Sequence, residues 1–126
     1  MRGKLIVLDG ADGAGKDTQA DRLFVAAKNR GLSAAIIRFP AYDKTFSGKE
    51  VRAYLSGTFG ELETCHPKLI SYLYAVDRFE MQVELNKLLE SHELLIAARY
   101  VISNIAYQAA RLPKEERPAF REWAEA

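Results

Sequence analysis

The chain has 126 residues and a net charge of +1, and it is 48% hydrophobic and 28% charged. This balance is typical of a soluble globular domain, or part of one, and argues against disorder. The near-neutral charge disfavours non-specific nucleic-acid binding, which usually shows a basic excess. Its one cysteine, Cys65, excludes an internal disulfide framework and a cysteine-rich zinc site. The early apolar run is too short for a membrane span and lacks a signal-peptide cleavage pattern, so we expect a cytoplasmic protein.

The first elements read as strand, glycine-rich loop, helix and strand. An apolar run at residues 4–8 predicts a strand buried on both faces of a parallel sheet. Residues 16–30 have helical spacing, and Gly31 follows in the usual position of a helix-ending glycine. A second strand is predicted at residues 34–39. This order implies parallel strands and a right-handed crossover.

The later elements continue the alternation of helices and strands. Pro67 suits a first helical position, and one long helix is predicted from there to about residue 90. The other predicted elements are a loop at 41–46, a short helix at 48–56, a polar connection at 58–65, a buried strand at 93–98, a helix at 102–111 and an amphipathic segment after Pro113. We therefore expect an α/β fold with helices on both faces of a parallel sheet.

The end of the chain lies within an apolar-rich helical segment, whereas domains more often end in a polar loop or a capped element. No repeat, low-complexity tract or interdomain linker interrupts the sequence. We expect residues 1–126 to form a single domain whose C-terminal part lies beyond this chain.

The strongest chemical signal is the segment at residues 10–18, Gly-Ala-Asp-Gly-Ala-Gly-Lys-Asp-Thr. Its spacing Gly-x4-Gly-Lys, between a predicted strand and a predicted helix, is that of a phosphate-binding loop (P-loop). Glycines let backbone N–H groups turn toward phosphate oxygens, and the helix N-terminus adds positive potential. Lys16 supplies a mobile charge for the outer phosphates. The predicted phosphate-binding residues are Gly10, Gly13, Ala14, Gly15, Lys16, Asp17 and Thr18.

One position of this loop departs from the usual pattern. The residue after the lysine is normally Ser or Thr, whose hydroxyl binds Mg²⁺, and here it is Asp17. Thr18 lies about 100° further around the helix and does not substitute for that hydroxyl. A carboxylate can ligate Mg²⁺, although it also brings negative charge close to the phosphates. Asp17 is therefore the candidate metal ligand.

Three further motifs narrow the interpretation. They are Arg38-Phe39-Pro40 after the second strand, Tyr-Ala-Val-Asp-Arg at residues 74–78, and the segment 98–108 that begins Ala-Arg-Tyr. In this order and spacing, together with the phosphate loop, they resemble the thymidylate kinases, and residues 40–60 resemble a bacterial thymidylate-kinase-like subgroup. The resemblance covers nearly the whole chain. It implies a P-loop NTPase-type fold and transfer of a phosphoryl group from ATP, with Mg²⁺, to dTMP.

The resemblance also implies an acceptor site. Asp12 would contact the sugar 3′-hydroxyl, and Phe39 and Pro40 would wall the pocket. Tyr74 would stack on thymine, and Arg78 would donate to a thymine carbonyl. The spacing agrees, because residues four apart on a helix share one face and an aromatic ring beside a planar guanidinium suits a nucleobase.

The resemblance assigns the remaining roles to the segment after the third strand. Arg99 would hold the acceptor phosphate, and it follows a buried strand, at the sheet edge where ligands bind in open α/β folds. Lys16 and Arg99 would be the catalytic residues. Tyr107 would disfavour a 2′-hydroxyl. The residues that would line the base and the sugar are Ser103, Asn104, Tyr107 and Gln108.

The chain departs from the family pattern at several positions. Ala98 stands where the family usually has an aspartate near the metal, and Tyr42 lies near the position of a phosphate-binding arginine in many relatives. The loop carries no basic residue at positions 13–14, so the family pattern places the catalytic arginine in a lid beyond residue 126. Asp77 is interpreted as a residue of the solvated helix face, with no role.

Two alternatives and one partner remain open. The chain could belong to a kinase for another nucleotide, or it could be a non-catalytic nucleotide-binding module. The leucine-rich long helix could pack on a second copy, since the family is commonly dimeric. We expect the small molecules ATP and dTMP as partners, with neither nucleic acid nor membrane.

Overall fold

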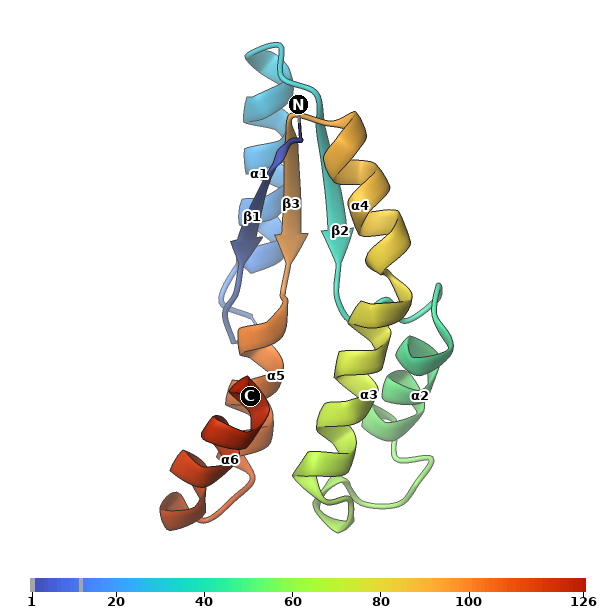
Figure 1. The fold of residues 1–126 in the computed structure, drawn as a ribbon, viewed down its shortest axis with the longest axis vertical. Coiled ribbons are helices and arrows are strands. Elements are labelled where there is room, and N and C mark those ends of the chain that lie inside the picture. The colour runs from blue at the N-terminus through green and yellow to red at the C-terminus, as the bar shows by residue number, and fades with distance from the viewer. Residues whose placement is uncertain (1, 12) are drawn as a thin grey trace. The chain divides into compact units, whose positions relative to one another are not determined.

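The computed structural model describes residues 2–11 and 13–126, and it contains two compact units. The sheet unit comprises the residues up to Phe39 together with Met81–Tyr100, and the helical unit comprises Pro40–Glu80 and Val101–Ala126. The elements (Figure 1) are β1 (Lys4–Leu8), α1 (Lys16–Asn29), β2 (Ala34–Arg38), α2 (Phe46–Leu55), η1 (Leu62–Thr64), α3 (Pro67–Glu80), α4 (Gln82–Ser91), β3 (Leu94–Ala98), α5 (Val101–Ala110), η2 (Lys114–Glu116) and α6 (Arg117–Glu125). Within the described residues, no helix is both long and apolar enough to cross a membrane.

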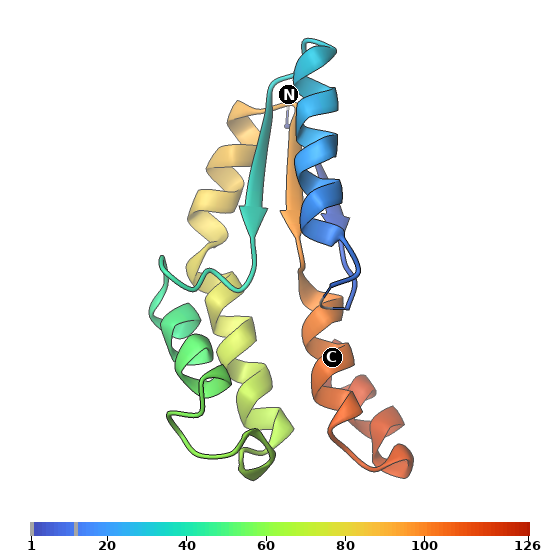
Figure 2. The same ribbon diagram turned by 180° about the vertical axis from the view of Figure 1, so that it is seen from behind.

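The sheet unit confirms the predicted α/β architecture. Its three described strands are parallel in the order β1-β3-β2, so β1 and β2 each pair with β3 and not with each other. Helix α1 lies over one face of this sheet and α4 over the other (Figures 1 and 2). The order of elements along the chain does not reveal that β3 lies between β1 and β2, because this pairing joins strands that are far apart in the sequence.

The core of the sheet unit centres on the middle strand. Leu95 and Ile96 of β3 are 0% exposed, and Ala20 of α1 is 0% exposed and packs in the same cluster as Ile96. Strand β1 differs, since Leu5 and Val7 are 37% and 38% exposed. The prediction that this strand is buried on both faces is therefore wrong. An edge strand has neighbouring strands on one side only, which leaves its side chains less covered.

The predicted long helix is also wrong, because it breaks at Met81. Helix α3 ends at Glu80 and α4 begins at Gln82, and Met81 itself has φ −85° and ψ −3°, a turn conformation. No glycine or proline stands at the break, so the sequence carries no local signal for it. The break coincides with the boundary between the two units in the chain.

The helical unit is built from packed helix pairs, α2 with α3, α3 with α5, and α5 with α6. Arg111, just after α5, ties the connection around η1 to this packing. The guanidinium of Arg111 donates to the carbonyl of Leu62 at 2.5 Å and to that of Cys65. The Cζ atom of the same guanidinium lies 5.8 Å from the centroid of the Tyr54 ring. Burial raises the pKa of Tyr54, and the nearby Arg111 charge opposes that rise.

We predict that two leucines at paired positions of neighbouring strands differ sharply in their contribution to the free energy of unfolding. Leu5 and Leu95 are register partners, but Leu5 is 37% exposed and Leu95 is fully buried. Leu95→Ala should lower the free energy of unfolding by about 2–5 kcal/mol, because it leaves a cavity in the core. The matched Leu5→Ala should lose less than half of that. Urea unfolding followed by circular dichroism measures both, and equal losses would contradict the assignment of β1 to an exposed edge.

Candidate functional site

The glycine-rich loop between β1 and α1 has the backbone that phosphate binding requires. Gly13 and Gly15 have φ of +77° and +95°, a left-handed conformation that glycine adopts without strain. The N–H of Ala14 donates to the carbonyl of Ala11 at 3.1 Å, which closes the turn. Gly15 is the N-cap of α1 and has no side chain to accept from the first-turn N–H groups. Those N–H groups can therefore serve an anion.

The residues of the loop differ in exposure. Lys16 is the first residue of α1 and is half-buried, like Gly10 and Gly15, whereas the other described loop residues are exposed. These exposed residues are Ala11, Gly13, Ala14, Asp17 and Thr18. The predicted sugar contact, Asp12, lies outside the described residues. The predicted phosphate cradle therefore consists of the loop backbone and Lys16 at the start of α1, and phosphate binding there stays a prediction.

Arg99 lies beside this loop at the same edge of the sheet. Its N–H donates to the carbonyl of Leu8, the last residue of β1, at 2.9 Å, and Leu8 is the register partner of Ala98. Arg99 has φ +67° and is the one non-glycine with positive φ in the described part of the chain. Such a conformation costs about 1–3 kcal/mol and is concentrated at functional sites. The strained backbone therefore marks Arg99 as a functional candidate.

Phe39 lies at the same edge. Its N–H donates to the Ala98 carbonyl at 3.1 Å, its side chain is 6% exposed, and its ring centroid is 5.3 Å from that of Tyr100. The sheet unit thus brings together the loop, Arg99 and Phe39, as the positions of these residues after parallel strands predicted.

An ion-pair cluster at the start of α1 was not predicted. The Nη2 atom of Arg38 lies 2.9 Å from Oδ1 of Asp21, and its Nε lies 3.6 Å from Oδ1 of Asp17. All three side chains are about half to two-thirds exposed. Sequence analysis used Arg38 only as part of a motif. The sequence signal that could have predicted this cluster is the pair Asp17 and Asp21, because acids four apart on a helix share a face and one arginine can bridge them.

The candidate metal ligand can be tested against the groups around it. Among residues 2–11 and 13–126, no cluster of three His, Cys, Asp or Glu side chains could hold a metal ion. Magnesium in nucleotide sites, however, usually takes one or two protein carboxylates, and the other ligands are phosphates and water. Asp17 directly follows Lys16, is exposed and fits that single-carboxylate role. A cation there would compete with Arg38 for the same carboxylate.

The helical unit carries the residues predicted to recognise a base. Tyr74 and Arg78 lie four apart on α3 and are both half-buried. Pro40 is buried at the start of the loop that precedes α2. Helix α5 carries four further predicted residues with a range of exposures. Ser103 is half-buried, Asn104 is buried, Tyr107 is exposed and Gln108 is buried.

Asn104 has an unsatisfied polar atom. Its Nδ2 donates to the carbonyl of Ser71 at 3.4 Å, while its Oδ1 is buried and has no hydrogen-bond partner among residues 2–11 and 13–126. The hydroxyl of Ser71 is buried and unpartnered as well. A buried polar atom without a partner is costly, and a ligand group can satisfy it. Gln108 differs, because its Oε1 already accepts from Arg111 at 2.9 Å.

Asp77 is the residue that sequence analysis most clearly misjudged. The helical pattern predicts that Asp77 lies on the solvated face of the helix, but its side chain is buried and the residue is only 1% exposed. Its carboxylate accepts from the N–H of Ala41 at 3.0 Å and from the hydroxyl of Thr45 at 2.5 Å. The placement is wrong because the loop before α2 covers this position of α3, a long-range contact that helical periodicity does not show.

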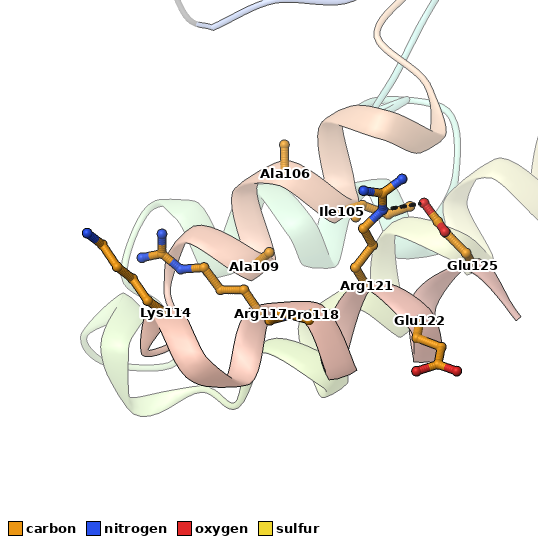
Figure 3. A pocket seen from close by; sticks show the side chains of 9 residues that line it. All are labelled: Ile105, Ala106, Ala109, Lys114, Arg117, Pro118, Arg121, Glu122 and Glu125. Atoms are coloured by element: carbon orange, nitrogen blue, oxygen red, sulfur yellow. Dashed lines mark hydrogen bonds and ion pairs between the residues drawn. The ribbon is translucent and has the colours of Figure 1, made fainter.

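A cavity of about 620 Å³ lies along α5, η2 and α6 (Figure 3). Its lining residues are Ile105, Ala106, Ala109, Lys114, Arg117, Pro118, Arg121, Glu122 and Glu125. Arg121 pairs with Glu125 at 2.9 Å, and Nε of Arg117 donates to the carbonyl of Leu112 at 2.9 Å. Arg117, Arg121 and Glu125 therefore have partners within the protein, and none of the predicted site residues lines the cavity.

Comparisons with known proteins find the following similarities. The family model described as thymidylate kinase matches residues 8–117. The chain is 35% identical over 108 residues to thymidylate kinase of Mycobacterium tuberculosis (strain ATCC 25618 / H37Rv), covering 86% of this chain and 50% of that protein. It is 39% identical over 109 residues to thymidylate kinase of Halothermothrix orenii, with the same coverage of 86% and 50%.

A solved structure of thymidylate kinase from Candida albicans is similar with a TM-score of 0.77 and 28% identity. The match covers 98% of this chain and 56% of that one. The chain thus spans about half the length of the curated relatives it matches.

We predict that Asp17 and Asp21, both paired with Arg38, differ in their effect on phosphate binding. Asp17→Asn should tighten binding of inorganic triphosphate without metal roughly fivefold, because it removes a negative charge beside the loop, at ~1 kcal/mol for an exposed charge. It should also abolish most of the gain in affinity that Mg²⁺ gives. Asp21→Asn, one turn further along α1, should change neither. Calorimetric titration with and without Mg²⁺ measures both effects, and an undiminished Mg²⁺ effect in Asp17→Asn would remove Asp17 as a ligand.

Proposed function

Because the chain belongs to the thymidylate kinase family, we propose that it carries the phosphate loop and the acceptor-recognition residues of an enzyme that transfers the γ-phosphoryl group of ATP to dTMP. The observation that carries this proposal is the match over residues 8–117, which includes the phosphate loop, Arg99 and the motifs on α3 and α5. The product would be dTDP, a precursor of dTTP. The proposed location of the reaction is the cytoplasm.

The proposed transfer needs alignment and charge neutralisation more than proton chemistry. The acceptor is already an anionic phosphate oxygen, so no strong general base is required. Backbone N–H groups of the loop and Lys16 would bind the phosphates of ATP, and Arg99 would bind the phosphate of dTMP. Their common sheet edge supports these roles, since the Arg99 N–H is bonded to the strand that leads into the loop. Mg²⁺, with Asp17 as its protein ligand, would supply further neutralisation of phosphate charge.

Base recognition would fall to the helical unit. Tyr74 would stack on thymine, and Arg78 would donate to one of its carbonyls. Asn104, whose buried side chain donates to the carbonyl of Ser71 on α3, would line the base as well. Ser103, Tyr107 and Gln108 would line the base and the sugar, with Tyr107 against a 2′-hydroxyl. The role of Asp12 at the 3′-hydroxyl follows from the family resemblance alone.

An apolar stripe on α3 supports a second copy of the chain as a partner. Leu69, Tyr72, Val76 and Phe79 are 65%, 58%, 42% and 72% exposed. Their spacing of three, four and three residues places them along one side of the helix, as in a helix-pairing seam. An exposed apolar row of this kind is typical of an interface, and in a homodimer the same stripe would meet itself.

We predict that the chain binds dTMP in preference to dUMP, dCMP and ribo-TMP in competition calorimetry. Arg78→Ala and Arg99→Ala should each weaken dTMP binding by about tenfold or more, the loss expected when a hydrogen bond to a charged group is removed. Arg22→Ala, an exposed arginine on α1, is the matched control and should bind as the unmodified chain does. Circular dichroism verifies that each variant is folded.

The competing functions give different results in the same experiment. A preference for another nucleotide would favour a kinase with a different acceptor. A folded chain that binds triphosphate but no nucleoside monophosphate would favour a non-catalytic nucleotide-binding module and would sink the acceptor-site assignment.

We predict a dimer that depends on the α3 stripe. Phe79→Glu should shift the chain from dimer to monomer in sedimentation velocity at micromolar concentration, because it places a charge within an apolar contact. Val25→Glu, at a 54% exposed position on α1, should leave the dimer intact. An unmodified chain that sediments as a monomer would contradict the homodimer.

A further inference from the structure

Asp77 is a buried carboxylate to which the proposed reaction assigns no role. It is 1% exposed and lies on α3 between Tyr74 and Arg78 in the sequence. Burying a carboxylate is expensive unless hydrogen bonds and charge compensation replace its water. The hydrogen-bond partners of Asp77 therefore indicate the structural role of this buried carboxylate.

Those partners all come from the loop that leads into α2. Both carboxylate oxygens accept from the N–H of Ala41, at 3.2 and 3.0 Å, and Oδ1 also accepts from the hydroxyl of Thr45 at 2.5 Å. Thr45 in turn accepts from the N–H of Gly48 at 2.7 Å and so caps α2. One buried carboxylate thus connects α3 to both ends of the segment 41–45 and to the first turn of α2.

The fit of this segment leaves little freedom. A Cβ atom at Gly48 would lie 2.2 Å from the carbonyl oxygen of Ala41, so the first turn of α2 packs directly on the loop backbone. Ala41 and Thr45 are themselves 6% and 5% exposed. The segment has no regular secondary structure between Ala41 and Thr45, and its position depends on these side-chain contacts.

Glu80, one turn after Asp77, binds the same helix start from the surface. Its carboxylate accepts from the N–H of Phe46 at 2.9 Å and from that of Ser47 at 3.1 Å. The Ser47 hydroxyl and these backbone N–H groups lower the pKa of Glu80. Unlike Asp77, Glu80 is exposed, and its hydrogen bonds described above reach Phe46 and Ser47 of α2. It provides a matched comparison, a second carboxylate of α3 at the same helix start.

We infer that Asp77 is a positioning residue for the acceptor nucleotide, because it holds the Pro40–Thr45 loop against the helix that carries Tyr74 and Arg78. This inference rests on the proposed function of those residues. Pro40, which would wall the acceptor pocket, directly precedes Ala41, so the bond from Ala41 to Asp77 sets where Pro40 lies relative to α3. Asp77 itself does not touch the nucleotide.

The test separates acceptor binding from phosphate binding. Calorimetry measures the Kd of dTMP and, independently, the Kd of inorganic triphosphate, which reports on the loop of the sheet unit. Asp77→Asn and Thr45→Val should each weaken dTMP binding about tenfold, since they break a buried hydrogen bond to a charged group. Triphosphate binding should stay within about twofold, a difference below ~0.5 kcal/mol. Thr45→Ser, which keeps the hydroxyl, should restore dTMP binding, and Glu80→Gln should leave it within the same limit.

Each other outcome contradicts the inference in a specific way. Unchanged dTMP binding in folded Asp77→Asn and Thr45→Val would show that the loop position does not matter for the acceptor. Parallel losses of dTMP binding, triphosphate binding and thermal stability would reduce Asp77 to a purely structural residue. The unmodified chain tests the proposed function separately, because failure of the folded chain to bind any nucleoside monophosphate would reject the acceptor site itself. Thr45→Val removes only the hydroxyl, so it provides a readout if Asp77→Asn does not fold.

Discussion

Parallel pairing of β3 with both β1 and β2 is the constraint on which the phosphate half of the site depends. Ala98 is the register partner of Leu8 and of Arg38, so three strands end at the same level. Everything that follows those strands then starts at one sheet edge. The glycine-rich loop, Arg99 and Phe39 lie together for this reason, although about 90 residues of chain separate the first two. Backbone hydrogen bonds from Arg99 to Leu8 and from Phe39 to Ala98 extend the register beyond the strands.

The charges at this edge are balanced within the protein before any ligand arrives. Lys16 and the uncapped first turn of α1 favour an anion, whereas Asp17 adds a negative charge at the same place. Arg38 lies between Asp17 and Asp21 and offsets that charge. An arginine at the end of β2 can therefore accommodate a carboxylate where the loop usually has a hydroxyl. The left-handed backbone conformation of Arg99 is also unfavourable, and the hydrogen bond from the Arg99 N–H to the Leu8 carbonyl helps to hold that conformation.

In the helical unit, the order of the loop before α2 comes from the neighbouring helix rather than from its own backbone. Asp77 accepts from the N–H of Ala41 in that loop, and Glu80, one turn further along α3, accepts from the N–H groups of Phe46 and Ser47, which a helix start leaves without partners. Asp77 binds from within the protein and Glu80 from its surface. The same helix carries Tyr74 and Arg78, so the placement of the loop and of the proposed base-binding side chains has a common origin. Asn104 adds a buried acceptor that has no hydrogen-bond partner among the described residues.

The sequence by itself determined the phosphate loop, the extent of most helices and strands, and the family, because glycine spacing, periodicity and motif order are local properties of the chain. Helix α1, for instance, begins at the predicted Lys16 and ends just before Gly31, whose φ is +79°. Only the tertiary structure decided which strand lies in the middle, how exposed β1 is, where the long helix breaks and why Asp77 is buried. These features depend on contacts between residues far apart in the sequence. Asp77 shows the reason most clearly, since its partners lie 32 and 36 residues away and nothing in the pattern of α3 itself distinguishes a solvated aspartate from one covered by a distant loop.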